Sequence, residues 1–564
     1  MTFAEAVTGV TASDFTLFGT GTSNDTIAVS GSGASYVVTV TYKDNTGSGN
    51  KGKSLGVNFV NNTGVHESET NDTTPALATN ITTPQFSSLA PAGVAGEAIN
   101  LALTDPGAAP GTMITLMISG AASDSIISGG TRNADGSWTV QTDDPGSLTI
   151  TPSTNSVGAS VLQINETWTN ADGSAGGASV TDNVEVYASG NPIFAWSGDD
   201  TLTGSAAPDE FIFSQPIGND VVRSFDVAAD RIGLIGYGGF ASFADVQAHL
   251  GSSADGSALI TLADGQTITL EGVSASSLTA ANFEFNVTPV VTNSGTMMIG
   301  DGALLPMSGT INNSGAISLG STGDATVFQL IQNGITLQGG GHVVLSDSGG
   351  NLITGSLPSV EFNNVDNTIS GAGNIGGGSM SLVNGGTIIA DGANALVIDT
   401  GTNAVVNTGT IEATGLGGLQ VIGATVNNGL LLDQSSSIVI GGDLTGTGHV
   451  EIGGSATIEF GGQSSNDIAL DANATGLIVF DHSAGFSGSI SGLNGDDRLD
   501  LRDLQFSANT SLAYADDGQG GGVLTISDGA QSVQLHLHGS YQLSDFTLGS
   551  DGQGGLLVTN GLLG

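Results

Sequence analysis

Two consecutive nine-residue segments, 195–203 and 204–212, carry residue types that bind calcium. Each ends a turn-forming stretch with an aspartate, Asp200 or Asp209, which is followed two positions later by an apolar residue. Glycine lets a turn bend and present carbonyl oxygens, and aspartate adds an anionic oxygen. Calcium prefers about six to eight oxygen ligands, so this spacing predicts a calcium site. We expect the ligands to come from Gly198, Asp200, Gly204, Asp209 and Asp220.

The spacing corresponds to a glycine- and aspartate-rich nonapeptide repeat in which each copy forms a half-turn of a parallel β-roll. The match is partial, because alanine, serine or tryptophan stands at several glycine positions and the next turn, 218–222, arrives two residues late. Residues 196–234 nevertheless resemble the hemolysin-type calcium-binding repeat of proteins exported by type I secretion. An acidic turn between two ordinary β-hairpins is the alternative interpretation.

The composition indicates an all-β protein of several domains. The chain has 8 Lys+Arg against 53 Asp+Glu, a net charge of −45, 89 glycines and no cysteine. Short apolar runs separated by Gly, Asn, Asp and Ser are typical of strands joined by turns. Nucleic-acid binding and binding to anionic membranes require a basic surface, so this acidic balance excludes both. No run of about eighteen apolar residues is present, so we expect no membrane insertion.

The first two units are expected to be tandem immunoglobulin-like β-sandwiches. Residues 1–73 resemble a bacterial immunoglobulin-like repeat that lacks its first strand, on the strength of the run from Phe3 to Phe15. Residues 75–190 resemble the immunoglobulin- or cadherin-like repeats of large bacterial adhesins, from the turn and strand at 133–140 and the strand at 148–152. The chain begins without a signal peptide, as a fragment would, and type I export needs none.

The segment 287–485 is predicted to be a right-handed parallel β-helix. Its marker is Asn-x-Gly, which recurs at separations of 20, 71, 23 and 20 residues, three of them close to the length of one rung. A short alternating strand follows each marker. Asparagine tolerates a left-handed corner and can stack in a ladder, and glycine supplies the bend. The markers begin at Asn293, Asn313, Asn384, Asn407 and Asn427.

Two related modules flank this solenoid, 191–286 and 486–564. Both contain an acidic turn, a β-hairpin and a closing aromatic strand, which indicates a duplication. In the second copy Asp496, Asp497 and Asp500 are candidates for a further calcium site. The acidic, cysteine-free C-terminus is expected to carry the type I export signal. A β-cap that shields the last rung from edge-to-edge pairing is the alternative role, and it is compatible with export.

A parallel β-helix joined to calcium-binding nonapeptides also describes secreted polysaccharide lyases and epimerases. Such enzymes need a cation to neutralise the substrate carboxylate and a base to remove a proton. No Lys or Arg lies between Arg231 and Arg498, and the glutamates Glu412, Glu451 and Glu459 are read as solvated strand positions. We therefore expect no catalytic centre, and a secreted carbohydrate-active β-helix enzyme is the alternative.

The sequence thus predicts a secreted or cell-surface protein of adhesion or surface structure whose cofactor is Ca²⁺. Extracellular calcium would fill sites of about 10⁻⁴ to 10⁻³ M affinity, whereas scarce cytosolic calcium would leave the acidic turns repelling one another. The expected partners are calcium and host or surface glycans and proteins. A purely structural layer protein is a third class.

Overall fold

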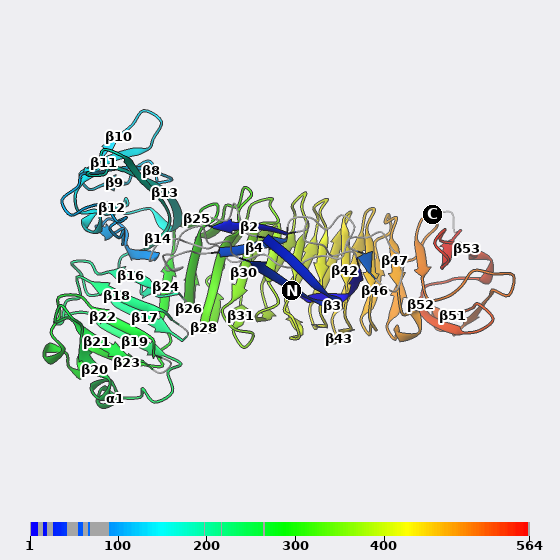
Figure 1. Ribbon diagram of the computed structural model, residues 1–564. Coiled ribbons are helices and arrows are strands. Elements are labelled where there is room, and N and C mark those ends of the chain that lie inside the picture. Colours follow the sequence, from blue (N-terminus) through cyan, green and yellow to red (C-terminus); the bar gives the residue numbers. More distant parts are fainter. Residues whose placement is uncertain are drawn as a thin grey trace. The chain divides into compact units, whose positions relative to one another are not determined.

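The computed structural model describes residues 90–561, except Ser197, Pro216, Ala263 and Asp264, and the backbone of five earlier strands (Figure 1). The described protein is all-β, with 50% strand and 5% helix, and it contains a β-solenoid of about 14 turns. The chain divides into two compact units, Met1–Ser87 and Ser88–Gly564. No helix among the described residues is long and apolar enough to cross a membrane.

The first unit contains two small antiparallel sheets, one of order β3-β1-β5 and one of β2 and β4. Its strands are β1 (Thr2–Thr8), β2 (Phe15–Gly19), β3 (Thr26–Thr41), β4 (Leu55–Phe59) and β5 (His66–Glu67). These pairings do not confirm an immunoglobulin-like topology, which stays a prediction for 1–73.

The second unit opens with two antiparallel sheets that enclose one apolar core. One sheet has the order β10-β11-β8-β13-β14 and the other β7-β12-β9. Leu116, Ile118, Leu162 and Ile164 alternate inward from β8 and β13 and are completely or almost completely buried. The immunoglobulin-like identity of 75–190 likewise stays a prediction. The strands are β6 (Ala90–Val94), β7 (Ile99–Asn100), β8 (Ile114–Ser119), β9 (Ile126–Ile127), β10 (Thr131–Arg132), β11 (Trp138–Thr142), β12 (Thr149–Thr151), β13 (Val157–Thr169) and β14 (Ala175–Tyr187).

Residues 191–286 form a short roll of two parallel ladders, β15-β17-β19-β23 and β6-β16-β18-β22. Phe194, Phe211 and Phe213 fill the space between the ladders and are fully buried. The helix α1 (Phe243–Ala248) and the strands β20 (Leu250–Ser252) and β21 (Ala258–Thr261) interrupt the winding, and β21 forms the expected hairpin with β22. The ladder strands are β15 (Ile193–Phe194), β16 (Asp200–Thr203), β17 (Glu210–Ser214), β18 (Asn219–Arg223), β19 (Arg231–Ile235), β22 (Thr267–Leu270) and β23 (Phe283–Phe285).

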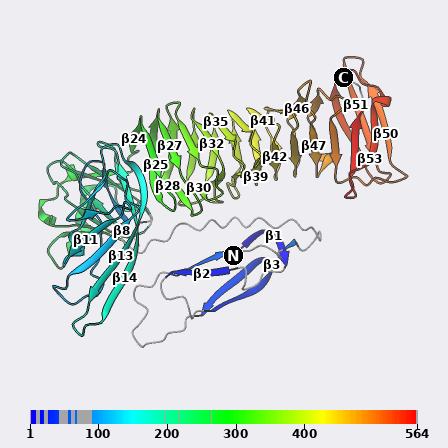
Figure 2. The same ribbon diagram turned by 90° about the horizontal axis from the view of Figure 1, so that it is seen from above.

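The predicted parallel β-helix is confirmed, and its strands form three parallel ladders (Figures 1 and 2). Its hand stays a prediction. The first ladder comprises β24 (Val290–Asn293), the second halves of β26 (Leu304–Asn313) and β28 (Thr326–Gln338), β31 (Glu361–Asn364), β34 (Ser381–Asn384), β37 (Val405–Asn407), β40 (Thr425–Asn427) and β43 (Leu444–Thr445).

Each strand of the second ladder comes after a first-ladder strand and the turn that follows it. The third ladder begins with the first halves of β26 and β28. The second comprises β25 (Thr296–Ile299), β27 (Ala316–Leu319), β29 (His342–Leu345), β32 (Thr368–Gly371), β35 (Thr387–Ala390), β38 (Thr410–Ala413), β41 (Leu430–Gln434), β44 (His449–Gly453), β46 (Asp467–Leu470) and β48 (Ser489–Ser491). The third continues with β30 (Asn351–Gly355), β33 (Gly373–Gly376), β36 (Leu396–Ile398), β39 (Leu419–Val421), β42 (Ser437–Ile440), β45 (Thr457–Phe460), β47 (Leu477–Phe480) and β49 (Arg498–Leu501).

Buried asparagines connect the rungs along the corner between the first and second ladders. Six of them donate the side-chain Nδ2 to the Oδ1 of another asparagine at 2.7–3.1 Å. The donor–acceptor pairs are Asn293–Asn313, Asn313–Asn367, Asn364–Asn384, Asn384–Asn407, Asn407–Asn427 and Asn427–Asn466. The expected ladder is confirmed, but none of these asparagines has the positive φ of a left-handed corner, so that part of the expectation is wrong.

The glycines of the Asn-x-Gly turns are required by close packing of successive rungs. A Cβ at Gly409 would lie 2.0 Å from the carbonyl oxygen of Gly386, and one at Gly429 would lie 2.1 Å from that of Gly409. Gly295 occupies the same position in the first rung, where a Cβ would meet nothing within 4 Å. The φ angles of Gly295, Gly409 and Gly429 lie outside the left-handed region. At Gly409 and Gly429 glycine is therefore required by the close approach of successive rungs and not by the backbone conformation of the bend.

The N-terminal end of the solenoid is closed by backbone pairing and by two side-chain amides. Strand β13 pairs in parallel with β25 of the second ladder. Asn183 donates to the carbonyl of Leu304 at 2.9 Å and accepts from its N–H at 3.0 Å, as a neighbouring strand would. Asn191 makes the same reciprocal pair with Thr292, at 3.0 Å in both directions. These contacts cover the edges of the third and first ladders.

The C-terminal module closes the other end. The hairpin strand β52 (Ser532–His538) joins β48 in parallel, as β22 joins β18 in the roll, and β54 (Leu556–Asn560) joins β49 in the antiparallel sense. The remaining strands are β50 (Ser511–Asp516), β51 (Gly521–Ser527) and β53 (Phe546–Ser550). The ladders therefore continue to Leu501, beyond the expected boundary at 485.

Candidate functional site

The predicted calcium ligands Asp200 and Asp220 are completely buried, and they are the first residue of β16 and the second residue of the adjacent strand β18. Asp200 Oδ2 accepts the backbone N–H of Trp196 at 2.9 Å, which closes the preceding turn. The backbone N–H of Asp200 donates to Asp220 Oδ1 at 2.9 Å. One oxygen of each carboxylate thus accepts a backbone hydrogen bond. The two aspartates form a stack across one turn of the roll.

The other two oxygens of this stack are unsatisfied. Asp200 Oδ1 and Asp220 Oδ2 are buried and have no hydrogen-bond partner among the described residues. Burial raises the pKa of both carboxyls well above the ordinary range, and for Asp200 the nearby Asp220 and Glu185 raise the pKa further. Removing a carboxylate from water without a counter-charge is costly, so this stack favours a proton or a cation.

Asp209 belongs to a different stack. Its backbone N–H donates to Asp230 Oδ1 at 2.9 Å, and Asp230 Oδ2 accepts the N–H of Asp226 at 2.8 Å. Asp209 in turn accepts the N–H of Ser205. The expected set therefore divides into Asp200–Asp220 and Asp209–Asp230. Sequence reasoning missed Asp230, although its separation from Asp209 is close to the 20 residues between Asp200 and Asp220.

Gly198 and Gly204, the expected carbonyl donors, lie where neighbouring turns approach closely. A Cβ at Gly218 would lie 2.4 Å from the Gly198 carbonyl oxygen, so the Gly198 carbonyl faces the next turn. The N–H of Gly204 donates to the carbonyl of Arg223 at 2.9 Å. A Cβ at Gly204 would lie 2.9 Å from the carbonyl oxygen of Ser224, so this glycine allows close stacking, whereas a Cβ at Gly198 would meet the Trp196 side chain of its own turn at 2.4 Å. The role of both glycines as calcium ligands stays a prediction.

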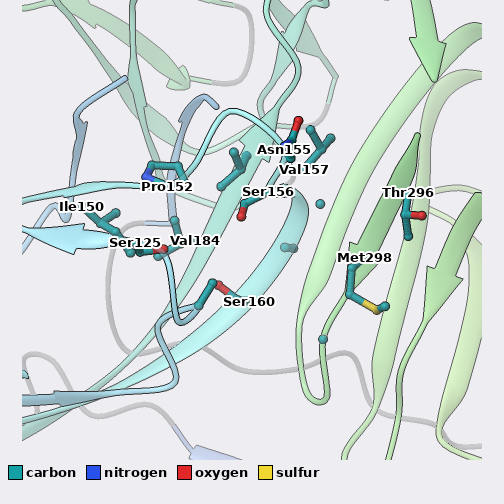
Figure 3. A pocket seen from close by; sticks show the side chains of 15 residues that line it. Ser125, Ile150, Pro152, Asn155, Ser156, Val157, Ser160, Val184, Thr296 and Met298 are labelled. Atoms are coloured by element: carbon teal, nitrogen blue, oxygen red, sulfur yellow. The ribbon is translucent and has the colours of Figure 1, made fainter. Parts of the chain in front are cut away.

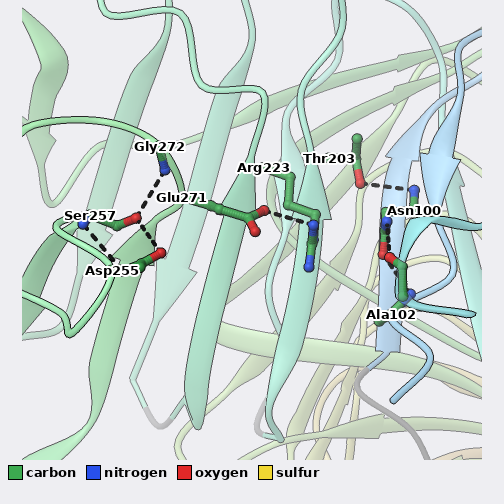
Figure 4. Close-up of polar contacts among 9 residues, drawn as sticks. Asn100, Ala102, Thr203, Arg223, Asp255, Ser257, Glu271 and Gly272 are labelled. Carbon is green, nitrogen blue, oxygen red and sulfur yellow. Dashed lines mark hydrogen bonds and ion pairs between the residues drawn. The ribbon is translucent and has the colours of Figure 1, made fainter. Parts of the chain in front are cut away.

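Polar contacts hold the rim of the roll and its junction with the preceding sheets (Figure 4). Arg223 at the end of β18 forms an ion pair of 2.7 Å with Glu271, which directly follows β22. Thr203 at the end of β16 accepts the N–H of Asn100 at 3.2 Å. These contacts hold β16 and β18 at the ends opposite to Asp200 and Asp220.

A buried polar network lies beside the stack and was not found from the sequence. Glu185 on β14 accepts from Asn183 Nδ2 at 3.0 Å and from the Tyr187 hydroxyl at 3.1 Å. Burial raises the pKa of Glu185 well above its usual value. Glu185 is therefore satisfied by neutral donors, and it adds to the local concentration of buried acids around Asp200.

The C-terminal candidates Asp496, Asp497 and Asp500 do not converge. Asp497 accepts the N–H groups of Gly476 and Asn494 at 2.7 and 2.8 Å, in the way that the roll aspartates close their turns. Asp496 is exposed. Asp500 lies 3.9 Å from Arg502 Nε, and Arg502 also binds Glu459 and Asp481 at 2.8 and 3.1 Å. Arginine thus already supplies positive charge beside Asp500.

The described residues contain no group of three or more His, Cys, Asp or Glu side chains arranged to hold a metal ion. Of the solenoid glutamates, Glu412 and Glu451 lie on the second ladder and Glu459 on the third. Glu451 contacts His449, with 3.2 Å between its Oε1 and the His449 Nε2. No family model and no curated protein matches the chain.

Proposed function

We propose that this chain is a non-catalytic calcium-binding repeat protein, secreted or displayed at the cell surface, that serves in adhesion or surface structure. The observation that carries the proposal is the Asp200–Asp220 stack in a parallel roll, with one buried and unpaired oxygen on each carboxylate. Two carboxylates held in this way repel each other and lack solvation. A divalent cation bound there offsets both costs.

Calcium then acts as a stabiliser of the folded roll. Binding to the folded state alone adds RT ln(1 + [L]/Kd), so near-millimolar extracellular calcium stabilises a site of about 10⁻⁴ M affinity by about 1 kcal/mol or more. Scarce cytosolic calcium leaves the same site empty, which keeps the chain competent for type I export. We propose that immunoglobulin-like units in 1–73 and 75–190 and the solenoid act as spacers or as surfaces that contact glycans and proteins.

Thermal unfolding of the full chain tests the proposal. About 5 mM Ca²⁺, well above the expected Kd, should raise the melting temperature at pH 7.5 more than Mg²⁺ at equal ionic strength, and a chelator should reverse the rise. Asp220→Asn removes one buried charge but keeps the oxygen that accepts the Asp200 N–H. This variant should be more stable than the native chain without calcium and should respond less to calcium.

The matched control is Asp172→Asn, which changes an exposed aspartate of the 170–174 turn and should leave the calcium response intact. A native chain whose melting temperature responds equally to Ca²⁺ and Mg²⁺, or to neither, contradicts the proposal.

A further inference from the structure

A pocket of about 340 Å³ lies where the antiparallel sheets meet the first rung of the solenoid (Figure 3). One wall comes from β12, β13 and β14, and the other comes from β25. The parallel pairing of β13 with β25 fixes the two walls, and it is so close that a Cβ at Gly158 would lie 1.9 Å from the carbonyl oxygen of Met298. The pocket is therefore part of a built junction.

The pocket surface is mainly apolar. Ile150, Val184 and Val186 belong to the core of the antiparallel sheets and show one face to the pocket. Val157 and Met298 complete the apolar surface, and the Met298 side chain is 49% exposed on its strand. Burying such surface against a ligand is favourable by about 25 cal/mol per Å².

Hydroxyl groups and the Asn155 amide supply the polar part of the lining. Ser125, Ser160 and Thr296 contribute side-chain oxygens that make no hydrogen bond to any other residue in the described ranges. Figure 3 shows Ser125 and Ser160 on one wall and Thr296 on the other. A ligand between the walls can exchange hydrogen bonds with these hydroxyls, which act as donors and acceptors.

The charge pattern selects the class of ligand. None of the 15 lining residues is acidic, basic or aromatic. A cation therefore finds no carboxylate in the pocket, and an anion is disfavoured by the net charge of −45. Sugars commonly need an aromatic platform, which this lining lacks. We propose that the pocket binds an uncharged amphiphile with a compact aliphatic body and a hydroxyl group.

Three probes with the same ring test the proposal on the full chain. Saturation-transfer NMR should detect saturable binding of cyclohexanol, and binding at least about tenfold weaker for cyclohexanecarboxylate and cyclohexylammonium, since a tenfold change in Kd corresponds to 1.4 kcal/mol. Two variants fill the pocket from opposite walls, Ser160→Phe and Thr296→Trp. Each should weaken cyclohexanol binding at least about tenfold.

The matched control is Ser119→Phe, which places the same ring on an exposed strand position outside the pocket and should leave binding unchanged. Melting curves identify a variant that does not fold. In that case the binding of cyclohexanol to the other pocket-filling variant tests the proposal. Absence of saturable cyclohexanol binding, equal binding of a charged probe, or equal loss in Ser119→Phe and a folded filling variant overturns the proposal. The outcome is independent of the calcium test.

Discussion

The Nδ2 of Asn407 donates to the Oδ1 of Asn427 at 2.7 Å, and both side chains are completely buried between rungs. The same Nδ2 lies within 3.3 Å of the carbonyls of Gly409 and Leu430, and Asn384 donates to the Asn407 oxygen at 2.9 Å. One side chain therefore satisfies polar groups on three successive rungs. Among buried side chains, such a network is stabilising only while it is complete.

Asn407→Ala should therefore destabilise the solenoid. It removes the hydrogen bond that Asn384 Nδ2 donates to Asn407 and the one that Asn427 Oδ1 accepts from Asn407. At about 0.5–1.5 kcal/mol for each buried hydrogen bond, the loss costs about 1–3 kcal/mol. The midpoint of denaturant unfolding should fall accordingly. Asn509→Ala, at an exposed position, should shift it by less than about 0.5 kcal/mol. Equal midpoints for the two variants would show that the ladder contributes no stability.

The glycine stack predicts opposite outcomes at equivalent positions of two rungs. Gly409→Ala places a Cβ 2.0 Å from the Gly386 carbonyl oxygen, so the backbones must separate, at a cost of about 1–3 kcal/mol or more. Gly295→Ala meets no atom and should change stability by less than about 0.5 kcal/mol. Melting temperatures of the two variants check this. If the glycines served only to bend the chain, both substitutions would be equally harmful.

The acidity of one core residue predicts a pH dependence. Asp433 points into the solenoid between Ala413 and Ile452, and burial raises its pKa to about 7. The folded state thus holds a proton that the unfolded state has already lost above pH 4. The stability contributed by this proton is complete below about pH 4, declines as the pH rises to 7, and is absent above 7.

Asp433→Asn should remove this decline. The variant should equal the native chain near pH 4 and exceed it in melting temperature near pH 8. Taking the difference between the two proteins cancels the contributions of all other acids. Asp391→Asn, at an exposed position, should show no such difference. A difference between Asp433→Asn and the native chain that is constant from pH 4 to 8 would contradict the raised pKa.

Removing residues 540–564 should expose the end of the third ladder. The deletion takes away β53 and β54, and so leaves the edge of β49 unpaired. Unpaired edges associate with other edges, so we expect aggregation in light scattering at concentrations where the native chain remains monomeric. If these residues also hold the export signal, the truncated protein should stay in the cytosol. Normal export of an aggregating product would leave only the cap role.

The solenoid could be predicted because its rungs repeat a local pattern. Asn407 and Asn427 follow the same alternating strand and precede the same glycine, so their equivalence can be read from the sequence. The ladder as a whole could not. Asn367 and Asn466 belong to the ladder although neither begins an Asn-x-Gly turn. Each accepts a hydrogen bond from an asparagine two rungs earlier, across a rung that has Gly341 or Gly448 at the corner.

The candidate site could be predicted only in part. Asp200 and Asp209 were identified from a nine-residue spacing, which relates opposite sides of the roll. Their stacking partners lie a full turn away, and only the parallel pairing shows that Asp220 and Asp230 serve them separately. Asn183 and Asn191 contact strands more than 100 residues later, and no local pattern marks such contacts.

The side-chain amides of Asn183 and Asn191 each bind the backbone N–H and C=O of a single residue of the first rung. Within the ladders, β52 and β54 pair only with the last strands, β48 and β49. The contacts at either end are therefore the same whatever the number of rungs between them. Insertion or loss of one complete rung changes the distance between the two ends by about 4.8 Å and disturbs no end contact. The solenoid can thus lengthen or shorten in evolution by the gain or loss of one rung at a time, while the contacts at its two ends stay the same.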